Sequence, residues 1–255
     1  MTMEKARRVT RLAPRPLSTA ASALASLPPL PDGHKRLYLI RHGETDWNTE
    51  NRIQGSTDKS LNAVGLRQAD ALRRYLADAP IELIASSHLR RAAQTADAVA
   101  AAHPRARRVA GQAAFAEMCF GELEGRRLEE FDWPAYLRAW RAGENDRALP
   151  GANGDRAGES PNAVAARGLE GLRSLGLLPG GAAPAAPARG AERHVLVAAH
   201  GRFNKILIAA LRGDVARASD VEQGNTAINV LDIAREGGAV VRALDLREHL
   251  RLAAT

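Results

Sequence analysis

The sequence predicts an α/β sandwich, because segments typical of buried strands alternate along the chain with segments typical of amphipathic helices. Residues 194–199 (HVLVAA) are the clearest apolar run for a buried strand, and residues 36–40 form another. Within residues 62–77, Leu72 and Leu76 belong to a set of apolar residues at near-helical spacing. Hydrophobic residues make up 45% of the 255 residues, which is enough for a substantial core and excludes a disordered chain.

The other expected elements follow from the same two patterns. Strands are expected at residues 36–40, 81–85, 194–199, 227–233 and 240–246. Helices are expected at residues 62–77, 89–102, 133–142, 161–175 and 203–211. The helix at 161–175 has a clear beginning, since Ser160 is a good N-cap and Pro161 suits a first turn. The order of strands and helices therefore indicates one domain, from residue 34 to residue 255.

Two segments are expected to lie outside the packed part of this domain. Residues 1–33 are rich in Arg, Ser, Ala and Pro, and their prolines prevent a long helix. This composition is compatible with an organellar transit peptide or with a disordered extension, so the protein is expected to be cytoplasmic, or organellar in the first case. Residues 178–193 are of low complexity and are expected to form a loop.

The charge of the chain indicates which partners to expect. The formal net charge is +7, and five basic against two acidic residues in 1–33 account for +3 of it. The remaining +4 is ordinary, and basic residues interleaved with aromatic ones, as in base-stacking surfaces, are absent from the sequence. No apolar run approaches the ~18 residues of a membrane-spanning helix. We therefore expect the protein to bind a small anionic substrate, and we expect it to bind neither nucleic acid nor a membrane. The chain is expected to be a monomer or a homodimer.

Two of the expected strands end in similar residues. The strand at 36–40 is followed by Arg41, His42 and Gly43, and the strand at 194–199 is followed by His200 and Gly201. Ligands of open α/β sheets bind beyond the carboxyl ends of the strands, so both histidines are expected to face one crevice. Glycine after each histidine allows a tight turn and the close approach of a ligand.

The run at residues 39–48 (LIRHGETDWN) resembles the signature of the histidine phosphatase superfamily, which includes the cofactor-dependent phosphoglycerate mutases. Similar blocks follow in the family's order at residues 51–55 (NRIQG), 87–96 (SHLRRAAQTA), 117–125 (EMCFGELEG), 158–160 (GES) and 200–201 (HG). Several blocks in one order make the resemblance specific. It implies a three-layer α/β sandwich with a mixed, mostly parallel sheet flanked by helices, as in the phosphoglycerate mutases.

The resemblance also implies catalytic roles. His42 is the expected nucleophile, because a neutral imidazole nitrogen attacks phosphorus without charge repulsion, and a phosphohistidine intermediate is implied at this position. Arg41 and Arg91 are expected to clamp the phosphoryl group, since guanidinium groups match phosphate oxygens with parallel hydrogen bonds. Glu117 is the expected acid, which protonates the leaving alkoxide and then activates water. His200, the third expected catalytic residue, would add a hydrogen-bond donor.

Further contacts to phosphate or substrate are expected from Asn48, Gln54, Gly55 and Gly201. The helix that follows His200 is expected to direct the positive end of its dipole at the anion. The remaining histidines show no spacing typical of metal ligands, such as HExxH, so neither a metal nor another cofactor is expected.

Two assignments stay open at this point. Glu122 or Glu124 is an alternative to Glu117 as the acid. Glu117 is favoured because three residues separate it from Gly121, as in the family's block. Arg202 occupies a position at which the family often has a small or apolar residue, and it is either a substrate contact or a surface charge.

The expected function is that of a metal-independent phosphatase that hydrolyses small phosphorylated metabolites. The alternatives are a cofactor-dependent phosphoglycerate mutase and a weakly catalytic member that binds phosphorylated ligands. The complete set of expected catalytic residues argues against the weak member. Mutases of the family carry a basic insertion after the third block, whereas the segment here is short, and the acid Glu124 before Gly125 is more typical of the phosphatases. Arg126 and Arg127 keep the mutase open, since they could hold a carboxylate.

Overall fold

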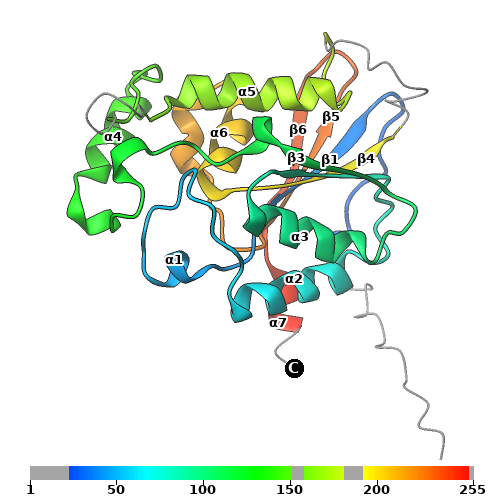
Figure 1. Cartoon of the computed structure of the whole chain (residues 1–255). Coiled ribbons are helices and arrows are strands. Elements are labelled where there is room, and N and C mark those ends of the chain that lie inside the picture. The colour runs from blue at the N-terminus through cyan, green and yellow to red at the C-terminus, as the bar shows by residue number, and fades with distance from the viewer. Residues whose placement is uncertain (1–22, 151–157, 181–191, 253–255) are drawn as a thin grey trace, which may run out of the picture.

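The computed structural model describes residues 23–150, 158–180 and 192–252 (Figure 1). One six-stranded sheet forms the middle layer, with the strand order β3-β2-β4-β1-β5-β6. Its strands are β1 (Lys35–Arg41), β2 (Leu83–Ser87), β3 (Arg107–Gln112), β4 (His194–Ala199), β5 (Ile228–Ile233) and β6 (Ala239–Leu246). Strands β1 to β4 pair in parallel, whereas β5 is antiparallel to both β1 and β6. The expectation of a mixed, mostly parallel sheet is confirmed.

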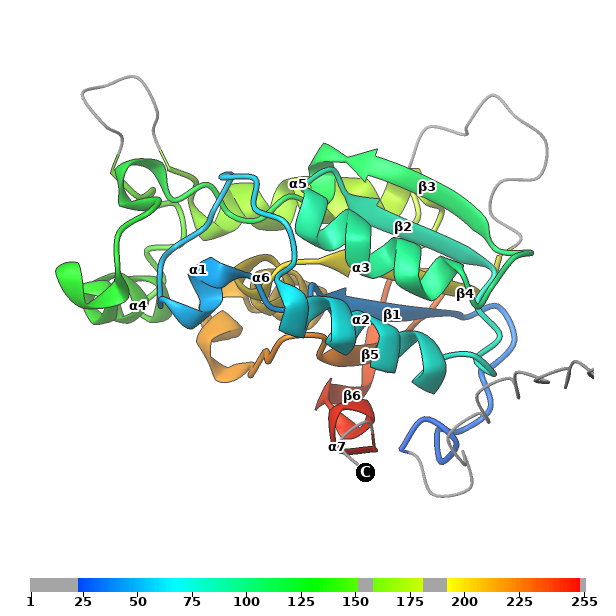
Figure 2. The same ribbon diagram turned by 60° about the horizontal axis from the view of Figure 1, so that its bottom comes forward.

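Helices cover both faces of the sheet (Figures 1 and 2). One face carries α5 (Pro161–Ser174) and α6 (Gly201–Leu211), and the other carries α2 (Ala63–Tyr75), α3 (Arg90–Ala100) and α7 (Glu248–Leu252). The short helices α1 (Asp46–Thr49) and α4 (Trp133–Arg141) lie to one side, and 3₁₀ helices lie at Ala113–Phe115, Gly121–Leu123, Leu128–Glu130 and Val215–Asp220.

Strand β1 shows why the core has two parts. Leu37 and Leu39 are fully buried in the cluster that includes α5 and α6, and Tyr38 and Ile40 belong to the cluster that includes α2 and α3. Successive side chains of a strand point to opposite faces, so a strand covered on both sides is apolar at every position. This is the physical basis of the apolar runs in the sequence.

Most expected elements are present with ends shifted by one or two residues, and the exceptions have physical causes. The strand expected at 81–85 is β2, which runs on to the fully buried Ser86 and Ser87. The strand β3 has no apolar run, because it lies at the sheet edge with two arginines at its start. Arg107 pairs with Glu192 at 2.8 Å there. Neither α1 nor α7 was expected, since each is too short to show helical periodicity.

Part of the segment expected to precede the domain packs against it. Leu24 and Leu27 lie against the cluster on the α2 side, and the Arg193 guanidinium donates to the carbonyl oxygens of Leu30 at 3.1 Å and Pro31 at 2.8 Å. Residues 1–22 and 181–191 lie outside the described residues, so the expected extension and the expected loop stay predictions there. None of the helices within the described ranges is long and apolar enough to span a bilayer.

His249 in α7 makes the stability of this fold depend on pH. Its side chain is fully buried, its Nε2 lies 2.8 Å from Thr226 Oγ1, and burial lowers its pKa to about 4. The unfolded chain, with a histidine pKa near ~6.5, therefore binds a proton between these values that the folded chain does not bind. The contribution of neutral His249 to the free energy of unfolding is complete above pH ~6.5. It is lost as the pH falls toward the folded-state pKa, and the total loss from this one group is about 3 kcal/mol.

We expect the free energy of unfolding, measured with denaturant, to fall between pH 7 and pH 5. In His249→Gln, which cannot titrate, we expect the fall to be smaller. His42 and His200 also have lowered pKa values and add to the dependence in both proteins, so the difference between the two slopes is the readout. If the free energy of unfolding fell equally steeply with pH in the wild type and in His249→Gln, the lowered pKa of His249 would not contribute to the pH dependence.

Candidate active site

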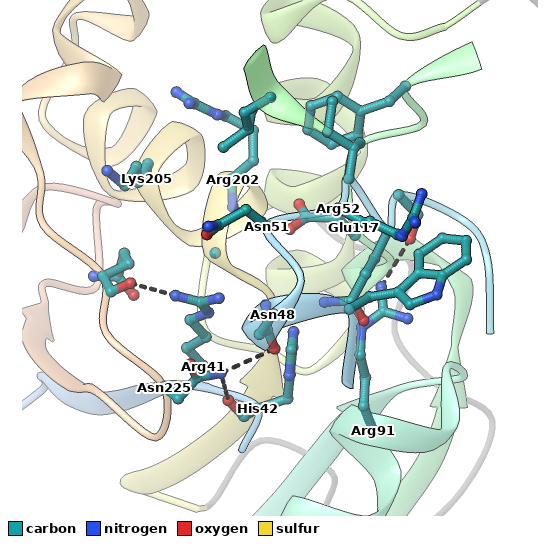
Figure 3. Close-up of a pocket in the computed structure, with 18 of the residues that line it drawn as sticks. Arg41, His42, Asn48, Asn51, Arg52, Arg91, Glu117, Arg202, Lys205 and Asn225 are labelled. Atoms are coloured by element: carbon teal, nitrogen blue, oxygen red, sulfur yellow. Dashed lines mark hydrogen bonds between the residues drawn. The ribbon is translucent and has the colours of Figure 1, made fainter. Parts of the chain in front are cut away.

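A cavity of about 440 Å³ opens at the carboxyl ends of β1 and β4, within the size range of metabolite pockets of ~300–1,000 Å³ (Figure 3). Its lining includes most of the residues expected from the sequence, namely Arg41, His42, Asn48, Gln54, Gly55, Arg91, Glu117 and Gly201. It also includes Arg202, whose role the sequence left open, and residues that were not assigned a role, among them Asn51, Arg52, Trp133, Lys205, Gln223 and Asn225. The cavity therefore offers more contacts than a phosphoryl group alone requires.

His42 follows the last residue of β1 and presents one free ring nitrogen. Its Nδ1 lies 2.6 Å from the Gly43 carbonyl oxygen, which can only accept, so Nδ1 carries the proton and Nε2 keeps its lone pair. Burial, followed by the charges of Arg91 and Arg41, holds the pKa of His42 well below its ordinary value. The imidazole is thus neutral at neutral pH, which is the state that a nucleophile needs.

His200 stands beside His42 at the end of β4. The two ring centroids are 5.3 Å apart, and His200 is fully buried. It does not belong to the cavity lining, unlike the other expected residues. Neither of its ring nitrogens has a partner among the described residues, and burial and the nearby Arg91 hold its pKa well below the ordinary value. A buried polar ring without partners is typical of a site that a ligand completes.

Arg41 and Arg91 are held by backbone carbonyl groups. Arg91, on α3, is fully buried and donates from Nη2 to the Gly55 carbonyl at 2.7 Å and from Nη1 to the Thr57 carbonyl at 2.8 Å. Arg41 Nη1 donates to the Gln223 carbonyl at 2.6 Å. The Nε of each arginine is buried without a partner in the described part of the chain. Burial lowers the pKa of Arg91 to about 10, so it remains a cation at neutral pH.

The loop that holds Arg91 is itself fixed by Glu124. The Glu124 carboxylate accepts from the Ser56 amide at 2.8 Å, from the Thr57 hydroxyl at 2.9 Å and from the Phe120 amide at 3.1 Å. Gly55, at φ +50°, passes so close that a Cβ would collide with this carboxylate. Glu124 thus orders the loop whose carbonyls bind Arg91, and it does not line the cavity.

Glu117 lines the cavity and is bound by the beginning of α6. Its carboxylate accepts from the backbone amides of Met118 at 2.9 Å, Phe203 at 2.8 Å and Arg202 at 3.1 Å. The sequence predicted that the α6 N-terminus would face the substrate anion, and this stays a prediction, with Gly201 at the helix start in the cavity lining. Two amides of that first turn, those of Arg202 and Phe203, bind the Glu117 carboxylate, which the sequence did not indicate. Glu122, the other candidate acid, is exposed and lies outside the lining.

Asn48 and Asn225 connect the two sides of the site. Asn48 Oδ1 accepts from the Thr45 amide at 3.1 Å and from Asn225 Nδ2 at 3.3 Å, which leaves the Asn48 amide nitrogen available as a donor. Asn225 also donates to the His42 carbonyl at 3.2 Å. No motif in the sequence points to Asn225 or to Gln223, because both act through contacts with segments far away along the chain. Gln54 lines the cavity with its Oε1 buried and without a partner among the described residues.

Residues 37–245 match the family model of the histidine phosphatase superfamily (branch 1). The chain belongs to this family. A probable phosphoglycerate mutase, GpmB of Yersinia pestis, is 32% identical over 192 residues, which cover 72% of this chain and 77% of that protein. An uncharacterized phosphatase, PhoE of Bacillus subtilis, is 40% identical over 92 residues, which cover 36% of this chain and 47% of that protein.

For the first curated relatives, from Proteus mirabilis and Bacillus subtilis, the match spans about half the length of the relative. Solved members of the histidine phosphatase superfamily match more completely. A mycobacterial glucosyl-3-phosphoglycerate phosphatase has a TM-score of 0.66 at 28% identity, over 83% of this chain and 99% of that one. A phosphoserine phosphatase mutant from Entamoeba histolytica, in complex with phosphoserine, has a TM-score of 0.64 at 25% identity, over 84% and 98%.

Proposed function

We propose that this protein is a metal-independent phosphatase that hydrolyses small phosphorylated metabolites through a phosphohistidine at His42. The observation that carries the proposal is the neutral His42, with Nε2 free, between the two fixed cations Arg41 and Arg91. A nucleophile and positive charge around the transferring phosphoryl group are what the reaction requires. The solved relatives named as phosphatases of small phosphorylated molecules support the same reading.

The reaction proceeds in two half-reactions. In the first, His42 Nε2 attacks phosphorus, the ester P–O bond breaks, and Glu117 gives its proton to the leaving oxygen. In the second, water attacks the phosphohistidine, Glu117 takes the proton from the water, and inorganic phosphate leaves as the P–N bond breaks. Arg41 and Arg91 supply the positive charge for both steps, and His200, whose ring nitrogens have no partner among the described residues, donates a ring N–H to the phosphoryl group.

A phosphoglycerate mutase is the second candidate, favoured by the match to the GpmB protein. A mutase holds the second anionic group of its substrate and keeps water away from the intermediate. Arg126 and Arg127, which the mutase interpretation relied on, are exposed and do not line the cavity. Arg127 lies 3.6 Å from Glu129 instead. Hydrolysis is therefore the stronger proposal.

We expect steady release of phosphate from a panel of small phosphomonoesters, without priming by bisphosphoglycerate and unchanged by excess chelator. The two arginines supply the positive charge that a metal would otherwise supply, and no group of three or more His, Cys, Asp or Glu residues in the described ranges has the arrangement of a metal site. Conversion of 3-phosphoglycerate to 2-phosphoglycerate that outpaces phosphate release would favour the mutase. Tight binding of phosphorylated ligands with no turnover would favour the weakly catalytic member.

A further inference from the structure

Two cations line the cavity at a distance from the nucleophile. Arg202 and Lys205 are three positions apart on α6, so they lie on the same face of that helix. Both line the cavity that contains His42. Figure 3 shows them on the side of the cavity opposite to Arg91 and His42. The phosphoryl group that His42 attacks is already served by Arg41 and Arg91, so these two further cations need a different explanation.

Neither cation has an acidic partner. In the described part of the chain, the Arg202 guanidinium and the Lys205 ammonium make no hydrogen bond or salt bridge with another residue. Most arginines in the described ranges do form a salt bridge, as Arg52, which lines the same cavity, does with Glu50 at 2.6 Å. The charge of Glu117 acts on Arg202, but the Glu117 carboxylate accepts from backbone amides of α6 rather than from the guanidinium. The two side chains thus keep their hydrogen-bond donors unused.

An aromatic ring fixes the orientation of Arg202. Its guanidinium carbon lies 4.8 Å from the centroid of the Trp133 ring, a cation–π arrangement that leaves the edge of the guanidinium plane free to donate. Trp133 is itself packed against Phe120 and Trp140, with ring centroids 5.7 Å and 5.5 Å away. The donor is therefore positioned before any ligand arrives, which lowers the entropic cost of binding.

The electrostatics of the pair favours an anion. Burial lowers the pKa of Arg202 to about 10, so the side chain stays charged at neutral pH. Burial also lowers the pKa of Lys205, and the nearby charge of Arg202 lowers it further. Two like charges that are partly withdrawn from water repel each other, and an anion between them relieves both the repulsion and the lost hydration.

We propose that Arg202 and Lys205 form a second anion subsite, so that the substrate is a phosphomonoester bearing a second oxyanion, a carboxylate or another phosphate. This inference rests on the proposed function, because it assigns the substrate class of the same cavity. The phosphomonoester lies between His42, Arg41 and Arg91, and the second oxyanion accepts from Arg202 and Lys205. Selectivity for such substrates comes from α6 rather than from the basic pair Arg126 and Arg127.

Binding of non-hydrolysable probes tests this independently of turnover. We would measure the dissociation constants of alkylphosphonates, phosphonocarboxylates and bisphosphonates of matched and increasing chain length by calorimetry. The wild type is expected to bind the best phosphonocarboxylate or bisphosphonate about tenfold or more tightly than the matched alkylphosphonate, which is the effect of charge-assisted hydrogen bonds to a second anion. Comparing the phosphonocarboxylates with the bisphosphonates shows whether the subsite prefers a carboxylate or a phosphate.

The preference is expected to disappear in Arg202→Met and, separately, in Lys205→Met. Arg212→Gln is the matched control, since it removes a cation from the exposed end of the same helix outside the cavity and should keep the full preference. Each preference is the ratio of two dissociation constants measured on the same protein, so a general change in affinity cancels. The two variants are made separately in case one of them fails to fold. Equal affinity of the wild type for the probes with one anionic group and those with two would overturn the subsite, as would a preference that survives in both variants. If the protein bound the probes with two anionic groups more tightly but hydrolysed no phosphomonoester, the second anion subsite would stand and the proposed phosphatase function would be wrong.

Discussion

Replacing His42 with alanine is expected to reduce kcat on phosphomonoesters by on the order of 10⁴-fold or more, because the attacking nitrogen is lost. We do not expect His200 to take its place, since it is fully buried and is not part of the cavity lining. The fold should survive, because the side chain follows the end of β1 and its hydrogen bond is to the neighbouring Gly43. Turnover of an aryl phosphate, together with a thermal melt followed by circular dichroism, measures both effects.

His88→Ala is the matched control for this substitution. His88 precedes α3, is exposed, and lies outside the cavity lining, so its loss should leave the rate unchanged. If His42→Ala kept most of its activity with a normal melt, His42 would not be the nucleophile.

Glu117→Gln is expected to have the second largest effect, and the effect should depend on the leaving group. A general acid contributes typically ~10²–10⁴-fold when the leaving group is a poor one. We therefore expect a loss on the order of 10²-fold or more on alkyl phosphates and a clearly smaller loss on aryl phosphates, whose phenolates leave with little help. Measuring kcat on both substrate classes gives the ratio that decides the role.

Glu122→Gln serves as control for this experiment, since Glu122 is exposed and outside the lining, and it should change neither rate. Because the Glu117 carboxylate also accepts from the Phe203 and Arg202 amides, the amide variant could disturb the start of α6. Such a disturbance would lower both rates equally. An equal loss on the two classes would thus show that Glu117 positions α6 and is not the acid.

The strands and helices whose positions follow from the spacing of apolar residues along the chain were predictable from the sequence. β1 and β4 are buried on both faces, so each is a continuous apolar run, and the histidine at each strand end lies next to the other. The edge strand β3 was missed because an edge position leaves its arginines free to reach Glu192 and Asp97. Its sequence therefore carries no apolar signal.

The grouping of Arg41, His42, Arg91 and Glu117 around one cavity was predictable, because each of them lies in a sequence block of its own or next to a strand end. The parts that were not predictable depend on contacts between distant segments. Glu124 is one of three acids in a short block, and only its bonds to residues 56, 57 and 120 show that it orders the loop around Arg91. Asn225 likewise gains its role from contacts with His42 and Asn48. The direction of α6 was foreseen, but not that the Glu117 carboxylate would occupy its first turn.

Trapping the covalent intermediate shows directly whether His42 carries the phosphoryl group during turnover. The protein would be mixed with a phosphomonoester, quenched within the first turnovers in alkaline denaturant, and digested for mapping of the phosphoryl group by mass spectrometry. We expect a phosphoryl group on His42 that is stable in base, labile in acid and absent from His42→Ala. A phosphoryl group on a different residue, or an equal yield from His42→Ala, would contradict it.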